Sequence, residues 1–447
     1  MRLKGYTYMS HKEIARSNRR RLILYFDSGV KAKDDGARLG VEVEHLVVTE
    51  DGDPVSYEPR DGGVGIREVL AYLEPWYPCK SVNSRGELLG LLGEEGSVTL
   101  EPAAQLEFSA APYERVSEIR RAYEHFTSHV AECLEPYGAH LVNRGYHPTR
   151  RAQQLVLIPK QRYAFMDAYF SYIGSHGDRM MRASASTQVS VDYFSEEDAV
   201  RKMRVASALS PVLAAIADNA PVYEGEANHV PIRRLQLWRE VDCRRCGTVP
   251  GVFDGGFGFE RYVDWLLSTS PIFVTRSEAG NTCGPSTRPF FDEAASEAYA
   301  DAPMDESDVE HLISMFWPDV RLKRFVEIRP ADSLPLLLML GYVALIKGIF
   351  YCERSLAAIE RTLGVSETAF VSRGAWPLNA CDVDEAISQI QRRGLAGEVY
   401  GMSLDAWERL LFSLARDALP EDEADLLVPL EEFAVQKPWW YVRNCGK

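Results

Sequence analysis

The stretch Leu39-Gly40-Val41-Glu42-Val43-Glu44-His45 alternates apolar residues with carboxylates. Successive side chains of a β-strand point to opposite sides, so this alternation predicts a strand over residues 38–48 with one acidic face and one apolar face. Three later stretches have the same polar spacing and are predicted to be short strands. Their polar residues are Gln105 and Glu107; Gln188, Ser190 and Asp192; and Glu327 and Arg329.

Such faces have two interpretations. One is the solvated outer face of an antiparallel sheet. An outer face, however, usually mixes lysine with acids, whereas these four stretches carry glutamates, amides and one arginine but no lysine. If the strands meet in one sheet, the carboxylates crowd together and repel unless cations lie between them. Hard divalent cations with oxygen ligands are the natural partner, and Mg²⁺ in turn suggests a nucleotide.

The bulk composition limits the possible partners. The 447 residues carry a formal net charge of -15, which argues against nucleic acid or an anionic membrane as the main partner. The longest uncharged apolar run, residues 334–346, is too short to span a bilayer and is predicted to be a buried helix. No signal peptide is evident, and eight scattered cysteines are typical of a cytoplasmic protein with reduced thiols.

The coarse organisation has three parts. Residues 1–35 are predicted to be a helical lead-in, residues 36–330 a catalytic domain, and residues 331–447 a mostly helical region packed on that domain. Within the catalytic domain we expect a long helix over residues 114–135 and a second helix capped by Ser195. His45 alternates with Glu44, so we expect it on the opposite face, in the core or behind the site.

Several motifs taken together resemble the plant-type and bacterial glutamate–cysteine ligases. The resemblance runs in order from about residue 20 to about residue 355. Three continuous stretches match: residues 39–45, residues 100–112 (Leu-Glu-Pro-Ala-Ala-Gln-Leu-Glu-Phe-Ser-Ala-Ala-Pro) and residues 185–192 (Ala-Ser-Thr-Gln-Val-Ser-Val-Asp). Three shorter motifs match as well: Arg234 four residues before Trp238; the segment that runs from Gly247 through Phe253-Asp254 to residues 257–260; and Glu327-Ile328-Arg329.

The resemblance implies a fold and a reaction. The family belongs to the glutamine-synthetase-like superfamily, so we expect an α+β fold in which a funnel of largely antiparallel strands has helices packed outside. It implies two or three Mg²⁺ ions, ATP as co-substrate, and ligation of glutamate to cysteine through a γ-glutamyl phosphate. Carried over by motif, the metal ligands would be Glu42, Glu44, Glu101, Glu107, Gln188 and Glu327.

The remaining site residues follow from the same resemblance. Arg234 would hold the substrate carboxylate, and Arg329 would lie near the transferred phosphoryl group. Trp238, Gln105 and Ser190 would contribute to substrate binding. The sequence departs from the family at Ala103-Ala104, where two glycines are common, and at Ser190, where asparagine is usual. Both departures bear on the identity of the substrates more than on the reaction type.

Alternatives remain open at this point. The amine substrate could be one other than cysteine. The same fold could instead belong to a guanidino or carboxylate kinase, or to a protein that binds a nucleotide without turnover. The expected partners are small molecules, with no nucleic acid and no membrane, and the expected state is a monomer or homodimer. Cys243-Arg244-Arg245-Cys246 could be half of a zinc site or a redox pair. Without a second such motif nearby, we interpret it as a tolerated variation.

Overall fold

The computed structural model describes residues 9–32, 36–60, 62–276, 286–289, 292–366 and 374–436. Its central element is a nine-stranded antiparallel sheet in the order β14-β15-β7-β1-β5-β4-β3-β2, with β6 paired to the far end of β1. Its strands are β1 (Leu39–Thr49), β2 (Cys79–Val82), β3 (Leu88–Leu92), β4 (Gly96–Leu100), β5 (Leu106–Ala110), β6 (Ala139–Val142), β7 (Thr187–Val191), β14 (Val320–Leu322) and β15 (Val326–Ile328).

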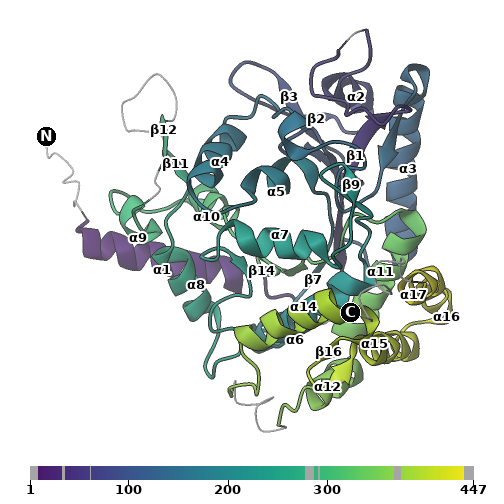
Figure 1. Ribbon diagram of the computed structural model, residues 1–447. Helices are drawn as coiled ribbons and strands as arrows, with labels where there is room; N and C mark the ends of the chain where they lie inside the picture. Colours follow the sequence, from purple (N-terminus) through teal and green to yellow (C-terminus); the bar gives the residue numbers. More distant parts are fainter. Residues whose placement is uncertain are drawn as a thin grey trace, which may run out of the picture.

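Helices cover both faces of this sheet (Figure 1). One group, which includes α3, packs on β5 and β6, and the helices α4, α5 and α7 lie on the other side. The principal helices are α1 (His11–Asp27), α2 (Ile66–Leu73), α3 (Val116–Leu134), α4 (Gln161–Tyr172), α5 (Gly177–Ala183), α6 (Glu196–Ile216), α7 (Arg233–Val241), α8 (Phe259–Ser268), α10 (Glu306–Ile313), α11 (Leu336–Phe350), α12 (Glu353–Thr362), α14 (Ala380–Arg393), α15 (Leu404–Ala418) and α17 (Leu427–Val435).

The apolar face of the sheet forms the core. Val41 and Val43 of β1 are buried, and Phe108 of β5 stacks on Phe126 of α3 with ring centroids 4.7 Å apart. Aromatic pairs of this kind add about 0.5–1.5 kcal/mol beyond the area that they bury. This packing fixes which face of each strand points inward, so the polar residues of the same strands all point to the other side.

Local signals in the sequence predicted several helix boundaries correctly. The Ser195 hydroxyl accepts a hydrogen bond from the Asp198 backbone N–H at 3.1 Å and caps α6. The helix predicted over residues 114–135 is α3, and the chain leaves it through Gly138 at φ 60°.

The long apolar run lies in α11, most of which is buried. In the described part of the chain, no single helix is long and apolar enough to cross a membrane; α11 and α12 reach that length and composition only as a pair bent by 83°.

The C-terminal helices pack directly on the rest of the molecule. α11 contacts β7 and β1 as well as α15 and α17, and α14 contacts α6. The α+β class, the antiparallel sheet and the helical C-terminal region are therefore confirmed. The division at residues 35 and 330 stays a prediction.

His45 lies on the apolar face, as predicted. Its side chain is fully buried, Nδ1 donates to the Leu106 carbonyl at 2.9 Å, and Nε2 accepts from the Tyr123 hydroxyl at 2.7 Å. Burial lowers the pKa of His45 to about 4, although the Leu106 carbonyl opposes that shift. The ring is therefore a neutral structural group.

The shifted pKa of His45 predicts a loss of stability in acid. The unfolded chain binds a proton at this ring below about pH 6.5, whereas the folded chain does so only near pH 4. The contribution to the free energy of unfolding is present above pH 6.5 and falls by roughly 3 kcal/mol as the pH drops to 4. In chemical denaturation at several pH values, His45→Gln should lose less stability than the wild type over this interval. The exposed His140→Gln should follow the wild type; equal slopes for all three proteins would refute the assignment.

Candidate active site

The four predicted polar strands are neighbours in one sheet, in the order β15-β7-β1-β5. Residues paired across adjacent strands point to the same face, so the polar side chains share one surface, here called the polar face. The pairs that build it are Glu327 with Ser190, Gln188 with Glu42, and Glu44 with Glu107. This arrangement confirms that the four faces meet, which the strand pattern left open.

The carboxylates on the polar face are close enough to raise each other's pKa. Burial, with repulsion from Glu101 and Glu107, raises the pKa of Glu44 to about 8. Burial raises the pKa of Glu42 to about 7, where Lys323 opposes the shift and Glu327 and Glu107 add to it. Burial and Glu101 likewise raise the pKa of Glu107 to about 7. The ionised carboxylates on the β1–β5 side of the face therefore lack sufficient compensating positive charge.

The hydrogen bonds of these carboxylates differ. Glu44 accepts from the Ser186 N–H at 2.7 Å and the Ser186 hydroxyl at 2.9 Å, and Glu107 accepts from the Thr99 hydroxyl at 2.6 Å. The side-chain carboxylates of Glu42 and Glu101 have no hydrogen bond or ion pair to any residue that the structure describes. Their oxygens are thus available to an external ligand.

The donor set fits a hard divalent cation. Carboxylate and amide oxygens are the ligands that Mg²⁺ and Ca²⁺ take, and a cation would relieve the repulsion that raises these pKa values. No three acidic, imidazole or thiol side chains among residues 9–32, 36–60, 62–276, 286–289, 292–366 and 374–436 converge as they stand on a single ion position. Ion binding would therefore need side-chain adjustment and further oxygens from water or phosphate, which Mg²⁺ commonly retains.

This electrostatic imbalance predicts that Mg²⁺ stabilises the protein even without nucleotide. At a free concentration one hundred times its Kd, an ion that binds only the folded state adds about 2.7 kcal/mol to the free energy of unfolding. Thermal shift in Mg²⁺ against EDTA, at constant ionic strength, measures this gain. Glu42→Gln should reduce it, whereas Asp51→Asn, an exposed carboxylate on the turn after β1, should leave it unchanged. A wild-type melting temperature that does not change with Mg²⁺ would contradict a cation site on the polar face.

Glu327 has a different environment from the other carboxylates. Arg321 binds it through two hydrogen bonds of 2.6 and 3.0 Å, Lys323 lies at 2.8 Å, and Arg329 at 3.0 Å. Burial alone would raise the pKa of Glu327, but these three cations hold it well below its usual range. Sequence reasoning missed Arg321 and Lys323, although their alternation in Val320-Arg321-Leu322-Lys323 was a visible signal of a basic strand face.

Two further cations near the acidic group were also missed. Burial lowers the pKa of Lys160, the residue before α4, and Glu101 is the charge that opposes this shift most strongly. Burial lowers the pKa of Arg162 as well, and its guanidinium donates to the Ser314 carbonyl at 2.7 Å. Both lie in a loop or the first turn of a helix, where no side-chain periodicity could mark them.

A small pocket beside the polar face collects three predicted site residues. Arg234 and Trp238 come from α7, Arg329 follows β15, and Asp319 lines the same pocket. The Arg329 guanidinium lies 5.6 Å from the centre of the Trp238 ring and donates to the Gln188 side-chain oxygen. The pocket therefore adjoins the carboxylates through Arg329 and Gln188.

Gln105 does not contribute to this surface. It is buried, its amide nitrogen donates to the carbonyls of Met181, Arg182 and Ser184, and its oxygen accepts from the Ala103 N–H at 2.8 Å. The backbone thus uses both ends of the amide, which contradicts the predicted role in substrate binding. Ala104, in the same turn, has φ 69°, a left-handed backbone conformation that glycine adopts more readily than alanine.

The Cys243-Arg244-Arg245-Cys246 motif forms neither a disulfide nor part of a metal-binding cluster among the described residues. Both cysteines are free, Cys246 is buried, and burial raises the pKa of its thiol to about 12. Arg245 between them is fully buried and forms a 2.7 Å ion pair with Asp242. Its interpretation as a tolerated variation stays a prediction.

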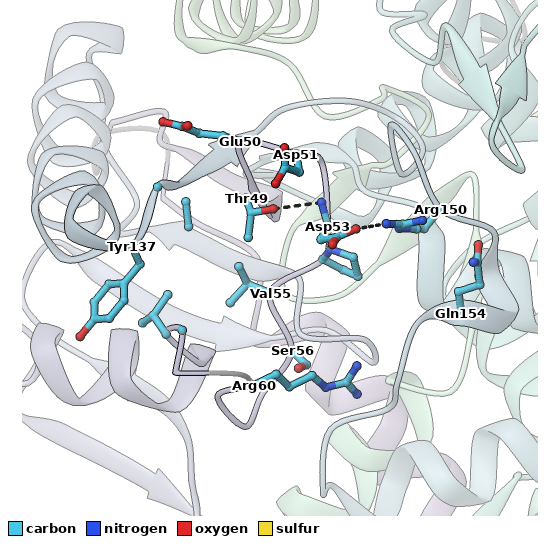
Figure 2. Close-up of a pocket in the computed structure, with 15 residues that line it drawn as sticks. Thr49, Glu50, Asp51, Asp53, Val55, Ser56, Arg60, Tyr137, Arg150 and Gln154 are labelled. Carbon is cyan, nitrogen blue, oxygen red and sulfur yellow. Dashed lines mark hydrogen bonds and ion pairs between the residues drawn. The ribbon is translucent and has the colours of Figure 1, made fainter.

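A second depression lies at the other end of β1 (Figure 2). Asp53 pairs there with Arg150, and the Asp53 N–H donates to the Thr49 hydroxyl at 3.2 Å. Thr49 lies five residues beyond Glu44, which is about 16 Å along an extended strand. This depression is distinct from the polar face, and its paired or exposed charges are those of an ordinary surface.

Comparisons with known proteins identify the family of this chain. The model of glutamate-cysteine ligase family 2 (GCS2) matches residues 38–432. Chloroplastic glutamate–cysteine ligase B of Oryza sativa subsp. japonica is 33% identical over 340 residues, which are 76% of this chain and 67% of that protein. The chloroplastic enzyme of Arabidopsis thaliana is 32% identical over 345 residues, which are 76% of this chain and 64% of that protein.

A solved structure supports the fold. The glutamate–cysteine ligase from Francisella tularensis in complex with AMP superposes with a TM-score of 0.51 at 9% identity, over 91% of this chain and 83% of that one. This similarity in fold agrees with the family match over most of the sequence. The chain belongs to glutamate-cysteine ligase family 2 and is an ATP-dependent ligase.

Proposed function

We propose that the protein joins the side-chain carboxylate of glutamate to the amine of cysteine, with ATP as the source of energy. The observation that carries this proposal is the acidic polar face beside a pocket with two arginines, in a chain of this family. The names of the plant relatives specify glutamate and cysteine, and we propose the same two substrates for this chain.

The roles of single residues are part of the proposal. The polar face would hold two or three Mg²⁺ ions, which would supply positive charge to neutralise the phosphates of ATP. Glu42, whose carboxylate has no hydrogen bond or ion pair among the described residues, is the clearest candidate ligand. The full proposed ligand set is Glu42, Glu44, Glu101, Glu107, Gln188 and Glu327.

The substrate side of the site would use the pocket. Arg234 would hold a carboxylate of glutamate, with Trp238 as the wall of the pocket. Ser190 is buried and pairs with Glu327 across the strands, and the family usually has the longer asparagine at this position. The shorter side chain leaves room near the reacting groups, so Ser190 is where we expect any difference in amine preference to arise.

The reaction divides into two displacements. An oxygen of the glutamate side chain attacks the γ-phosphorus of ATP, the bond to the β-phosphate oxygen breaks, and ADP leaves. The neutral amine of cysteine then attacks the acyl carbon, and inorganic phosphate leaves with the former carboxylate oxygen. Arg329 would place positive charge beside the transferred phosphoryl group, where its planar fork can contact two oxygens.

Product analysis tests this function. The protein is incubated with ATP, Mg²⁺, glutamate and a panel of amines that includes cysteine, and products are identified by mass and fragmentation. We expect γ-glutamylcysteine with one ADP and one phosphate per bond formed. Release of AMP would contradict phosphoryl transfer, and no adduct together with no ADP would refute the ligase.

The same assay separates the alternatives. An adduct with an amine other than cysteine would keep the reaction and change the substrate. ADP formed without any amine, together with a stable phosphorylated product, would indicate a kinase instead. The cytoplasmic location and the monomeric or homodimeric state stay predictions; the plant relatives are named as chloroplastic.

A further inference from the structure

Two of the three guanidinium nitrogens of Arg234 donate hydrogen bonds to other groups of the protein. Its Nε donates to Asp332 at 3.0 Å, and its Nη2 donates to the carbonyls of Arg329 at 2.8 Å and Ala331 at 2.6 Å. Among the described residues, Nη1 has no hydrogen-bond partner. Arg234 lines the pocket with Trp238 and Arg329, and Nη1 is the guanidinium nitrogen that these contacts leave unused.

Asp332 is the charged group that fixes this orientation. It is buried; Oδ1 accepts from Arg234, and Oδ2 accepts from the Asn219 backbone N–H at 2.8 Å. The two contacts use both carboxylate oxygens and prevent the carboxylate from rotating. The neighbouring Asp218 accepts from the Ile232 N–H at 2.7 Å and thereby holds the start of α7, the helix that carries Arg234.

Gly145 leaves the space that this carboxylate occupies. A Cβ atom added at Gly145 would lie 2.2 Å from Asp332 Cγ, well inside van der Waals contact. The φ angle of Gly145 is not among the positive ones, so its backbone would accept an alanine. The glycine is therefore needed for room beside Asp332, and a methyl group there would displace the carboxylate without changing any charge.

We propose that Asp332, seated against Gly145, is a positioning residue that turns Nη1 of Arg234 toward the pocket so that it binds a carboxylate of the amino-acid substrate. The inference rests on the proposed function for the identity of that substrate. Asp332 compensates the charge of buried Arg234 and selects which of its nitrogens the protein uses. A substrate carboxylate then meets a guanidinium whose direction is set before binding, which lowers the entropy cost of binding.

Steady-state kinetics on two variants test the proposal. In Asp332→Asn the side-chain oxygen can accept from Arg234 or from Asn219, and the new amide N–H₂ faces the other donor. We expect KM for glutamate to rise about 10²-fold, while kcat and KM for ATP change little. Gly145→Ala should produce the same selective rise. Gly63→Ala, whose added Cβ would lie 3.1 Å from the Arg60 carbonyl on an exposed segment, should leave KM for glutamate unchanged.

A double-mutant cycle separates positioning from general damage. If Asp332 acts through Arg234, adding Asp332→Asn to Arg234→Lys should raise KM for glutamate by much less than 10²-fold. Unchanged KM for glutamate in both Asp332→Asn and Gly145→Ala would overturn the proposal. So would a fall in kcat that accompanies equal changes in both KM values, since that indicates a structural role only.

Calorimetric titration of glutamate distinguishes a failure of the positioning role of Asp332 from a failure of the proposed function. Wild-type protein that binds glutamate as tightly as Asp332→Asn does would refute the positioning role and leave the ligase intact. A wild type that forms no glutamyl adduct with any amine refutes the proposed function instead, whatever the variants show.

Discussion

Replacing Glu42 by glutamine should lower the rate of ADP formation about 10²–10³-fold while the protein stays folded. Glu42 pairs with Gln188 on β7 and Ser109 on β5, in the middle of the polar face. Burial raises its pKa to about 7, and repulsion from Glu327 and Glu107 adds to that shift. A neutral amide removes this repulsion along with the attraction of Glu42 to Lys323, so we expect the fold to be kept, whereas a metal ion loses a charged ligand.

The measurement is ADP release at saturating ATP over a range of Mg²⁺ concentrations, with circular dichroism and thermal melting to verify the fold. Asp51→Asn is the matched control because it removes an exposed carboxylate outside the polar face. Near-normal turnover of Glu42→Gln at low Mg²⁺ would remove Glu42 from the ligand set.

Glu327→Gln is not an equivalent test of the metal ligands. Glu327 is fully buried and pairs with Arg321, Lys323 and Arg329. Removing one partner of a buried ion pair typically costs about 3–5 kcal/mol because the other charge stays behind. Loss of activity in Glu327→Gln would therefore mix loss of stability with loss of a ligand.

Replacing Arg329 by lysine should lower kcat about 10²–10³-fold. The Arg329 guanidinium bonds to the side-chain oxygen of Gln188 and to Glu327 at 3.0 Å, and lies over the Trp238 ring. A lysine ammonium is a point charge without the planar fork, so it cannot keep these contacts and also reach a phosphoryl group. The net charge of the site is unchanged, which isolates geometry as the cause.

Single-turnover measurement of phosphoryl transfer from labelled ATP detects this effect directly. Arg19→Lys, which alters a surface ion pair with Glu260 and Asp264, is the matched control. A phosphoryl-transfer rate for Arg329→Lys within a few-fold of the wild type would place Arg329 outside the reacting centre.

The sequence by itself determined the local features of this protein. Alternation of apolar and acidic residues in Val41-Glu42-Val43-Glu44 gave the strand and its two faces, because strand side chains alternate whatever the rest of the chain does. Ser195 gave a helix start, since a hydroxyl at that position satisfies a backbone N–H of the first turn. These outcomes depend only on residues close in sequence.

The tertiary structure alone decided the partners across the sheet and beyond it. Strand register sets Glu44 opposite Glu107 and surrounds Glu327 with Arg321 and its neighbours, and no spacing along one strand encodes the register of another. The alternation likewise placed Gln105 beside Glu107, but a tight turn at Ala104 directs its amide to backbone carbonyls. Asp332 meets Arg234 across 98 positions of sequence, because contacts between such distant residues form only when the whole fold closes.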